Sequence, residues 1–179
     1  MMRFFYSFLL LLTFSLPLSA QTTPPLATRL NEMKKLDYMA GEWKGTGWIE
    51  QREGGRQTFA GTEMVQRKLN GLTLLVEGKF KGKEAGKDEE IVVHETLAVI
   101  SYDEKAKTYR FRTYLANGMT GDYELKLIEG GWYWNIQFPG GQIKYTMKLG
   151  SKGEWVESGE MSRDGKSWRK FFEMTLIKQ

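Results

Sequence analysis

Cysteine is absent from this chain, and histidine occurs only once, as His94. The lack of cysteine excludes disulfides, thiolate metal sites, a thiol nucleophile and lipid attachment to a cysteine. A single histidine without cysteine is also a poor basis for a metal site, because such a site needs several ligands. We therefore expect a fold held together by packing, with no metal and no other cofactor.

The first twenty residues have the three parts of a secretory signal peptide. Arg3 supplies a positive charge, residues 4–12 form an apolar run, and Leu18-Ser19-Ala20 ends the segment with a cleavage pattern. We expect a mature protein that begins near Gln21 and is exported to the periplasm or out of the cell. An uncleaved membrane anchor is the alternative, although the run is short for a spanning helix. No later segment is apolar enough to span a bilayer as a helix.

Charge and motifs exclude several further classes of function. Lysine and arginine number 26 against 22 aspartates and glutamates, a formal net charge of +4. The basic residues are interleaved with acidic ones, so we expect a solvated exterior and no nucleic-acid partner. The sequence has no Gly-x-Ser-x-Gly elbow, phosphate loop, His-Glu-x-x-His or calcium loop. These absences favour binding over catalysis.

The chain does contain a regular alternation. Residues 41–177 form about ten short segments with apolar residues at every second position, separated by turns such as Asn70-Gly71 and Asp164-Gly165. Short connections favour antiparallel neighbours, and closure of the sheet removes its unpaired edges. The sequence therefore predicts an all-β fold, an up-and-down antiparallel β-barrel of about ten strands. A two-sheet sandwich is the alternative.

A short helix is predicted ahead of the barrel, over residues 26–35, because its apolar residues fall on one face. Residues 91–102 are apolar on both faces of their strand, which favours cover of the outer face by this helix. The predicted organisation is a signal peptide over 1–20, a leader and short helix over 21–35, and one β-barrel domain over 36–179.

Several short motifs resemble a known group of barrels. Gly41-Glu42-Trp43 matches the Gly-x-Trp that starts the first strand of lipocalins and other calycins. The longer run 41–47, with Tyr102-Asp103 and the segment 162–168, resembles nitrobindin-type barrels and related bacterial secreted families of unknown function. This resemblance covers residues 36–178. It implies a calycin-like barrel of eight to ten strands with an internal cavity for a hydrophobic ligand.

The resemblance has one departure. Nitrobindin-like barrels bind haem through a histidine near the C-terminus, and this chain has none after His94. Haem binding is therefore kept only as a weaker alternative.

Four residues at the start of the barrel are assigned structural roles: Gly41, Trp43, Gly45 and Gly47. We predict that the Trp43 ring fills the closed end of the barrel, since burial of so large a ring is worth a few kcal/mol. Gly45 and Gly47 share the face of Trp43 and permit a bend or close strand packing. Direct approach of a ligand over these glycines is the alternative.

Ten residues are candidates for contact with a ligand. They are aromatic, methionine, histidine and arginine side chains of the predicted strands: Phe80, His94, Tyr109, Arg110, Phe111, Arg112, Trp134, Tyr145, Met147 and Phe172. Aromatic rings with methionine suit an adaptable apolar cavity. His94 is either a structural residue or a polar contact in that cavity.

The strand over residues 109–115 has two possible orientations. If Tyr109 and Phe111 point inward, Arg110 and Arg112 are solvated. If the phase is reversed, the two arginines enter the cavity and would bind a carboxylate or phosphate headgroup. The sequence does not decide between these orientations.

The sequence as a whole predicts an exported, non-catalytic barrel that holds a small apolar or amphipathic ligand. One alternative is a structural or protein-interaction module of the cell envelope with a filled barrel. A weaker one is an enzyme, such as a hydrolase, that uses carboxylates and tyrosines of the barrel. The oligomeric state does not follow from the sequence.

Overall fold

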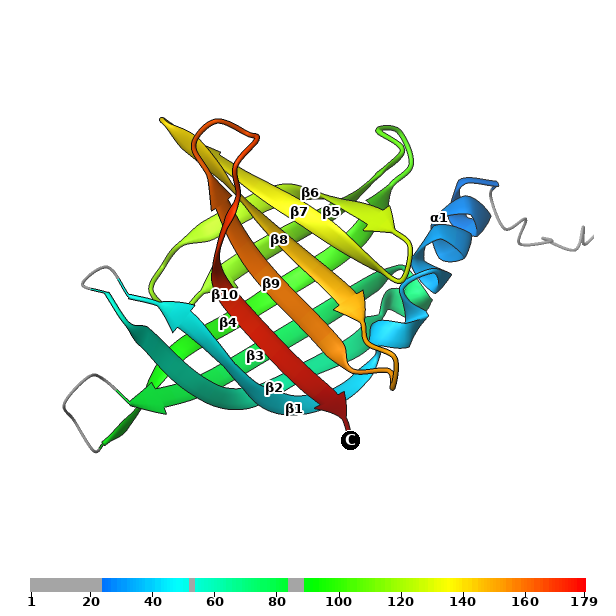
Figure 1. The fold of residues 1–179 in the computed structure, drawn as a ribbon. Coiled ribbons are helices and arrows are strands. Elements are labelled where there is room, and N and C mark those ends of the chain that lie inside the picture. The colour runs from blue at the N-terminus through cyan, green and yellow to red at the C-terminus, as the bar shows by residue number, and fades with distance from the viewer. Residues whose placement is uncertain (1–23, 52–53, 84–88) are drawn as a thin grey trace, which may run out of the picture.

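The computed structural model describes residues 24–51, 54–83 and 89–179 (Figure 1). The predicted signal peptide and its cleavage site lie outside this part of the chain. The elements, in chain order, are α1 (Pro24–Lys34), the 3-10 turn η1 (Asp37–Met39), β1 (Gly41–Glu50), β2 (Arg56–Lys68), the 3-10 turn η2 (Leu69–Gly71), β3 (Thr73–Lys83), β4 (Glu90–Asp103), β5 (Thr108–Leu115), β6 (Thr120–Ile128), β7 (Gly131–Phe138), β8 (Gly141–Leu149), β9 (Trp155–Ser162) and β10 (Arg169–Lys178).

The ten strands form one closed barrel. Each strand pairs antiparallel with the next along the chain, and β1 closes the circuit by pairing with β10 from Trp43↔Lys178 to Ile49↔Phe172. The predicted all-β, ten-stranded up-and-down barrel with one short helix is confirmed. A closed barrel leaves no edge strand to pair with another chain, and it excludes the two-sheet sandwich.

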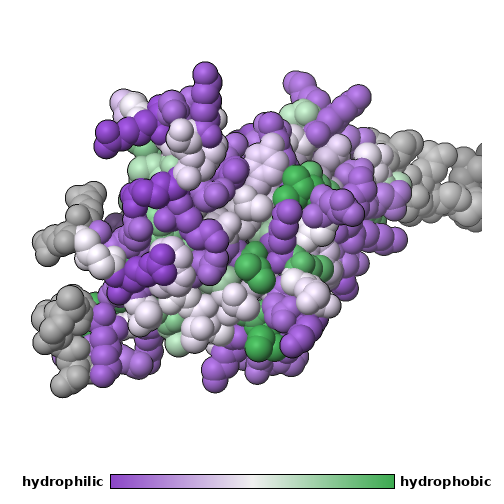
Figure 2. Space-filling view, viewed as in Figure 1, coloured by the Kyte–Doolittle hydropathy of each residue, from purple (hydrophilic) through white to green (hydrophobic). Residues whose placement is uncertain are grey.

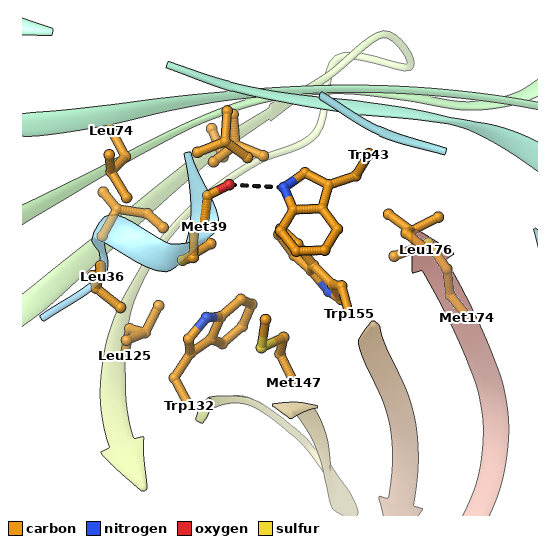
Figure 3. Packing of buried hydrophobic residues seen from close by; sticks show 14 of the residues in the cluster. Leu36, Met39, Trp43, Leu74, Leu125, Trp132, Met147, Trp155, Met174 and Leu176 are labelled. Carbon is orange, nitrogen blue, oxygen red and sulfur yellow. Dashed lines mark hydrogen bonds between the residues drawn. The ribbon is translucent and has the colours of Figure 1, made fainter. Parts of the chain in front are cut away.

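The two ends of the barrel differ. Helix α1 and the turns that follow β2, β4, β6 and β8 lie at one end, and the connections that follow the odd-numbered strands lie at the other (Figure 1). We call the first end the floor and the second the mouth. The floor is filled by side chains that are almost completely buried: Leu36, Met39, Trp43, Leu74, Ile100, Leu125, Trp132, Met147, Trp155 and Leu176 (Figure 3).

Trp43 lies at the centre of the floor and is 1% exposed. Its Nε1 donates a hydrogen bond to the Met39 carbonyl oxygen at 2.8 Å, which ties β1 to η1 (Figure 3). Its ring contacts the edge of Trp155 at a centroid distance of 5.6 Å, and Trp155 contacts Trp132 at 6.1 Å. Edge-to-face pairs of this kind add roughly 0.5–1.5 kcal/mol each to the burial of the rings.

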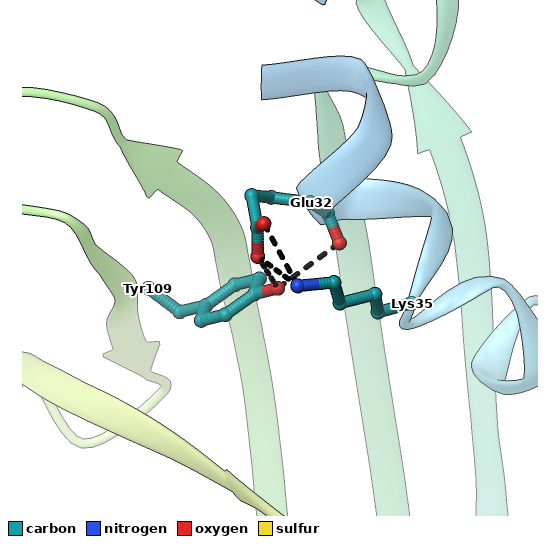
Figure 4. A network of polar contacts seen from close by, with 3 residues as sticks. All are labelled: Glu32, Lys35 and Tyr109. Carbon is teal, nitrogen blue, oxygen red and sulfur yellow. Dashed lines mark hydrogen bonds and ion pairs between the residues drawn. The ribbon is translucent and has the colours of Figure 1, made fainter. Parts of the chain in front are cut away.

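Helix α1 covers the floor and is held there by one polar network (Figure 4). The Tyr109 hydroxyl on β5 donates to the Glu32 carboxylate at 2.7 Å, and Lys35 contacts the same carboxylate at 2.7 Å. A helix of eleven residues is marginal alone, so these contacts and the burial of Met33 stabilise it. It begins at Pro24 rather than at the predicted residue 26, because proline is tolerated in the first helical turn.

Glycine at the start of β1 is required by close packing. Gly45 faces Gly61 of β2, and a Cβ at Gly45 would collide with the Thr175 carbonyl oxygen of β10. A Cβ at Gly47 would collide with the Phe59 ring. Gly41 has φ +137°, and a Cβ there would lie 2.6 Å from Cε of Lys178. Close packing by protein atoms thus occupies the positions over Gly45 and Gly47, where a ligand was the alternative.

The outer wall is mainly hydrophilic in the face that Figure 2 shows, with separate apolar spots. On β4, Val92 is 44% and Leu97 38% exposed. The expectation that the helix covers the outer face of this strand is therefore wrong, because α1 is occupied in closing the barrel end. Within the described ranges, no helix has the length and hydrophobicity to cross a bilayer.

Candidate functional site

Aromatic side chains line the inner wall between the floor and the mouth. Seven strands contribute these rings, two of them from the β-bulge of β10, and we call this set the aromatic belt: Phe59, Phe80, Phe111, Tyr123, Trp134, Tyr145, Phe171 and Phe172. Phe111, Trp134, Tyr145 and Phe172 are linked in series by ring contacts of 5.2, 4.7 and 5.9 Å. Phe172 stacks on Phe59, which in turn contacts Phe80 at 5.4 Å.

Strands β1 and β9 carry glycine at the level of the belt. Rings of neighbouring strands cover the positions where a Cβ of Gly47 or Gly159 would lie, so the belt continues across both strands. Beyond Phe80, the circuit ends at His94 on β4, whose ring centroid lies 6.2 Å from that of Phe80. The inner wall thus presents almost uninterrupted aromatic surface around the barrel.

Part of the belt differs from the floor in its access to solvent, although Phe59 and Phe80 are themselves buried. The floor residues are at most 2% exposed, whereas Phe111, Trp134, Tyr145 and Phe172 are only partly buried. Strand pairing places these residues on the inner face, opposite buried partners such as Leu125 for Trp134. Solvent therefore reaches them from inside the barrel through the mouth. The interior is filled at one end and accessible above it.

Two carboxyl groups lie on the inner wall. Glu63 of β2 is 7% exposed and faces Trp43 and Gly78 on the adjoining strands. Glu157 of β9 accepts a hydrogen bond from Trp155 Nε1 at 3.0 Å. Oε2 of Glu63 has no hydrogen-bond partner among the described residues. We call Glu63 and Glu157 the carboxyl pair.

Burial dominates the electrostatics of the carboxyl pair. Loss of solvation raises the pKa of Glu63 from its ordinary value of 4.5 to about 8, with a further contribution from the negative charge of Glu157. Burial raises the pKa of Glu157 to about 7, against the opposing effect of the Trp155 hydrogen bond. Glu63 is therefore mainly protonated at neutral pH, and its hydroxyl can donate a hydrogen bond.

Other polar groups on the inner wall also lack partners. Nε1 of Trp132 and Nε1 of Trp134 are buried, and neither has a hydrogen-bond acceptor in the part of the chain that the structure describes. Burial raises the pKa of Tyr145 to about 12, so its hydroxyl stays protonated. An unpaired buried donor costs roughly 1–3 kcal/mol, which a ligand acceptor or water could recover.

The residues predicted to contact a ligand divide into three groups. Six line the accessible interior or its edge: Phe80, His94, Phe111, Trp134, Tyr145 and Phe172. Met147 and Tyr109 belong to the floor region instead. Met147 is completely buried there, and Tyr109 is engaged with helix α1.

Arg110 and Arg112 form the third group and lie on the outer wall. Strand β5 pairs Ile100 with Phe111, so the aromatic phase faces inward and the arginines face outward. There both contact Asp122, Arg110 at 2.6 Å and Arg112 at 3.3 Å. The hypothesis of an arginine clamp for an anionic headgroup is therefore wrong.

Sequence reasoning missed the carboxyl pair, although a signal was present. Glu63 follows Phe59 and Gly61 at intervals of two, and Glu157 follows Trp155 in the same way. The period of two places all of them on one face of their strands. Burial of a carboxyl group is costly without a partner, so period alone is weak evidence that an acidic residue faces the interior.

A separate groove of about 560 Å³ lies on the outer wall over β10, β1, β2 and β3. Its lining mixes polar side chains such as Thr58, Lys81 and Glu173 with apolar ones such as Trp48, and it also includes Phe59. The guanidinium of Arg56 lies 3.6 Å from the centroid of the Trp48 ring. Buried polar groups without partners lie on the inner wall, so we place the candidate site inside the barrel.

Comparison with solved structures supports the fold. Rv2717c from M. tuberculosis aligns with a TM-score of 0.58 and 12% identity, over 82% of this chain and 96% of that one. The S-type phycobiliprotein lyase CPES from Guillardia theta aligns with a TM-score of 0.52 and 8% identity, over 82% and 91%. Both are calycin-like barrels, and at these identities the likeness concerns fold alone. No protein-family model and no curated protein matches the chain.

The inner wall does not fit haem. The only histidine, His94, lies on β4 rather than near the C-terminus. In the part of the chain that the structure describes, no group of three or more histidine, aspartate or glutamate residues could hold a metal ion.

Proposed function

We propose that this protein binds a small apolar or amphipathic molecule inside its barrel, in contact with the aromatic belt. The observation that carries the proposal is the contrast between a filled floor and a belt that solvent reaches from within. Ligand sites are concave and mostly apolar, with a few converging polar groups. The belt and the carboxyl pair supply both features.

The size of the expected affinity follows from burial of the ligand. Each CH₂ group transferred from water onto the belt contributes about 0.8 kcal/mol, so a decyl chain gains up to roughly 8 kcal/mol. Association costs several kcal/mol in lost freedom of motion, but the aromatic rings and polar contacts add to the gain. We therefore expect dissociation constants in the micromolar range for simple alkyl ligands.

We propose a binding role rather than a catalytic one. His94 contacts the Phe80 ring, and in the described residues no hydroxyl group is hydrogen-bonded to it. A histidine needs such a partner in order to activate a nucleophile. The carboxyl pair is the other candidate for chemistry.

We also propose that the protein is exported. The support is the pattern of residues 1–20, with Arg3, an apolar run and the cleavage pattern that ends at Ala20. Cell fractionation and N-terminal sequencing test this. We expect a mature chain that begins at Gln21 outside the cytoplasm. A full-length chain recovered from the cytoplasm would contradict export while leaving the binding proposal intact.

Binding is tested by native mass spectrometry of protein purified from its own compartment, and by titration with decanol followed by tryptophan fluorescence. We expect a co-purified small molecule or saturable decanol binding. The matched variants are Trp134→Leu in the belt and Trp48→Leu on the outer wall. Trp134→Leu should weaken binding by about tenfold, which corresponds to ~1.4 kcal/mol, and Trp48→Leu should leave it unchanged. Absence of both a bound molecule and saturable binding would refute the proposal.

A further inference from the structure

Acidic groups lie on the inner wall just below the aromatic belt, because Glu63 is opposite Gly78 and Glu157 is opposite Met174. Among the described residues, no basic side chain forms an ion pair with them, and the titratable groups of this level and of the belt are Glu63, Glu157, Tyr123, Tyr145 and His94. Burial lowers the pKa of His94, which keeps the imidazole neutral at pH 7. Deprotonation of these groups as pH rises can therefore only make the interior more negative.

Basic side chains near the floor are engaged elsewhere. Arg67, near the end of β2, contacts Asp37 at 2.8 Å. Lys178, at the end of β10, donates to the Tyr38 carbonyl oxygen at 3.2 Å and lies over the Trp43 ring. Neither residue contacts the carboxyl pair in the described structure. No internal cation accounts for the burial of the two acids.

The carboxyl pair also acts as a unit. Glu63 is opposite Trp43, the Trp43 ring contacts Trp155 at 5.6 Å, and Trp155 Nε1 donates to Glu157, so the two acids lie beside the same pair of indoles. The charge of Glu157 is accordingly one of the causes that raise the pKa of Glu63. Among the described residues, Glu63 Oε2 has no hydrogen-bond partner, and Glu157 Oε2 accepts the Trp155 hydrogen bond. Burial of Glu63 beside a partly buried Glu157, without a cation, costs several kcal/mol of stability, which a purely structural barrel could avoid with apolar side chains.

We infer that the carboxyl pair binds the cationic head of the ligand, an ammonium group, while the alkyl or aryl tail of the ligand lies against the aromatic belt. This inference rests on the proposed function and specifies the class of ligand. Trp134 and Tyr145 are stacked at 4.7 Å within the belt, which gives the tail a flat apolar surface. Fatty acids are disfavoured by the same site, because like charges repel at short range.

Binding is coupled to the loss of a proton. In the free protein at neutral pH, Glu63 holds a proton, because its pKa is about 8. An ammonium ion that enters the site favours the ionised carboxylate, so Glu63–COOH and R–NH₃⁺ become Glu63–COO⁻ paired with R–NH₃⁺, and one H⁺ passes to solvent. No covalent bond in the ligand changes. Amine affinity should therefore rise with pH, because less work is needed to remove the proton.

The experiment compares decylamine, decanol and decanoic acid, which share one chain length and differ in headgroup. Affinities are measured by tryptophan fluorescence at about pH 6 and about pH 9, a range that spans the titration of the carboxyl pair. We expect decylamine to bind at least about tenfold more tightly than decanol at the higher pH, a difference of ~1.4 kcal/mol. The preference should shrink at the lower pH, and decanoic acid should bind most weakly.

Three variants locate the effect. Glu63→Gln with Glu157→Gln removes both charges and should abolish the preference for decylamine while decanol still binds. The matched control is Glu77→Gln, which replaces an exposed glutamate of β3 on the outer wall and should keep the preference. Should the double variant fail to fold, the pH dependence of the wild-type preference decides on its own.

Equal binding of decylamine and decanol to the wild-type protein at both pH values would overturn the inference and leave the proposed function standing. A preference that persists in the folded double variant would do the same. Failure of all three ligands to bind would overturn both.

Discussion

The carboxyl group of Glu63 lies over Gly78, the residue opposite it on the neighbouring strand. A Cβ built at Gly78 would come 2.6 Å from Oε1 of Glu63, well inside contact distance. Glycine at position 78 thus provides the space in which the buried acid is accommodated.

The Gly78→Ala variant should force the Glu63 side chain out of its position. Overpacking of this kind costs roughly 1–3 kcal/mol of unfolding free energy. Urea denaturation of Gly78→Ala, Glu63→Ala and the double variant forms a double-mutant cycle. The cost of Gly78→Ala should largely disappear when Glu63 is alanine. Equal costs in both backgrounds would mean that the two residues do not compete for space.

Stability should fall as pH rises through the neutral range. The pKa of Glu63 is raised from 4.5 to about 8 and that of Glu157 to about 7, so the folded state binds more protons than the unfolded state between these values. The slope of unfolding free energy against pH is then negative. His94 acts in the opposite direction below about pH 6.5, because its pKa is lowered on folding.

The window from about pH 7 to about pH 8.5 therefore isolates the carboxyl pair, and we expect a loss of about 1 kcal/mol across it. Urea denaturation at several pH values measures this loss, and Glu63→Gln should reduce it. A stability that is constant or rises across this window would contradict the raised pKa of Glu63.

Trp43 should be the most important side chain of the floor. Trp43→Phe loses the 2.8 Å hydrogen bond to the Met39 carbonyl and part of the contact with Trp155. We expect a cost of about 2–3 kcal/mol, and about 3–5 kcal/mol for Trp43→Ala. Trp48→Phe on the outer wall is the control and should change thermal stability little. A floor that tolerates Trp43→Ala as well as Trp48→Ala would show that this ring does not close the barrel.

Removal of one hydroxyl should loosen the helix. Tyr109→Phe deletes the 2.7 Å hydrogen bond from the Tyr109 hydroxyl to the Glu32 carboxylate. Because the acceptor is charged, this hydrogen bond contributes roughly 1.5–3 kcal/mol of stability. Hydrogen exchange should become faster in α1 and remain unchanged in the β-barrel strands. The control is Tyr114→Phe, because Tyr114 is an exposed residue of the same strand. Unchanged exchange in α1 would show that this hydrogen bond does not hold the helix, and that apolar packing and the Arg29–Glu104 ion pair suffice.

The two arginines of β5 should be irrelevant to the interior. Arg110→Ala with Arg112→Ala removes the contacts to Asp122 on the outer wall. Exposed ion pairs contribute little, about 1 kcal/mol or less each. Binding of decanol and decylamine should therefore match that of the wild-type protein. Loss of binding would show that the two arginines face the cavity and that the orientation of β5 is the reverse of the one described.

The sequence predicted the barrel because its alternation has one physical cause. Inner positions such as Trp43 and Trp132 must be apolar to fill the floor. The connections between successive strands are short. The period of two carries that pattern directly. Cover of β4 by the helix was predicted wrongly, because periodicity shows which faces are apolar but not which other element lies against them.

The site was harder to predict for two reasons. The phase of β5 depends on pairing with β4, where Ile100 faces Phe111, and pairing is a long-range property. The division between floor and belt depends on which inner positions α1 and η1 cover. Met147 and Trp134 are both apolar residues at inner positions, yet Met147 is completely buried in the floor and Trp134 is only partly buried.

The most direct test of the central claim, that the belt binds a ligand, is a methyl NMR titration of methionine-labelled protein with decanol. Met161 and Met174 lie on inner positions of β9 and β10, whereas Met64 and Met119 lie outside the barrel. The account predicts shift changes and intermolecular NOEs at Met161 and Met174, with Met64 and Met119 unaffected. Saturating decanol that leaves Met161 and Met174 unchanged, or perturbs only Met64 and Met119, would contradict it.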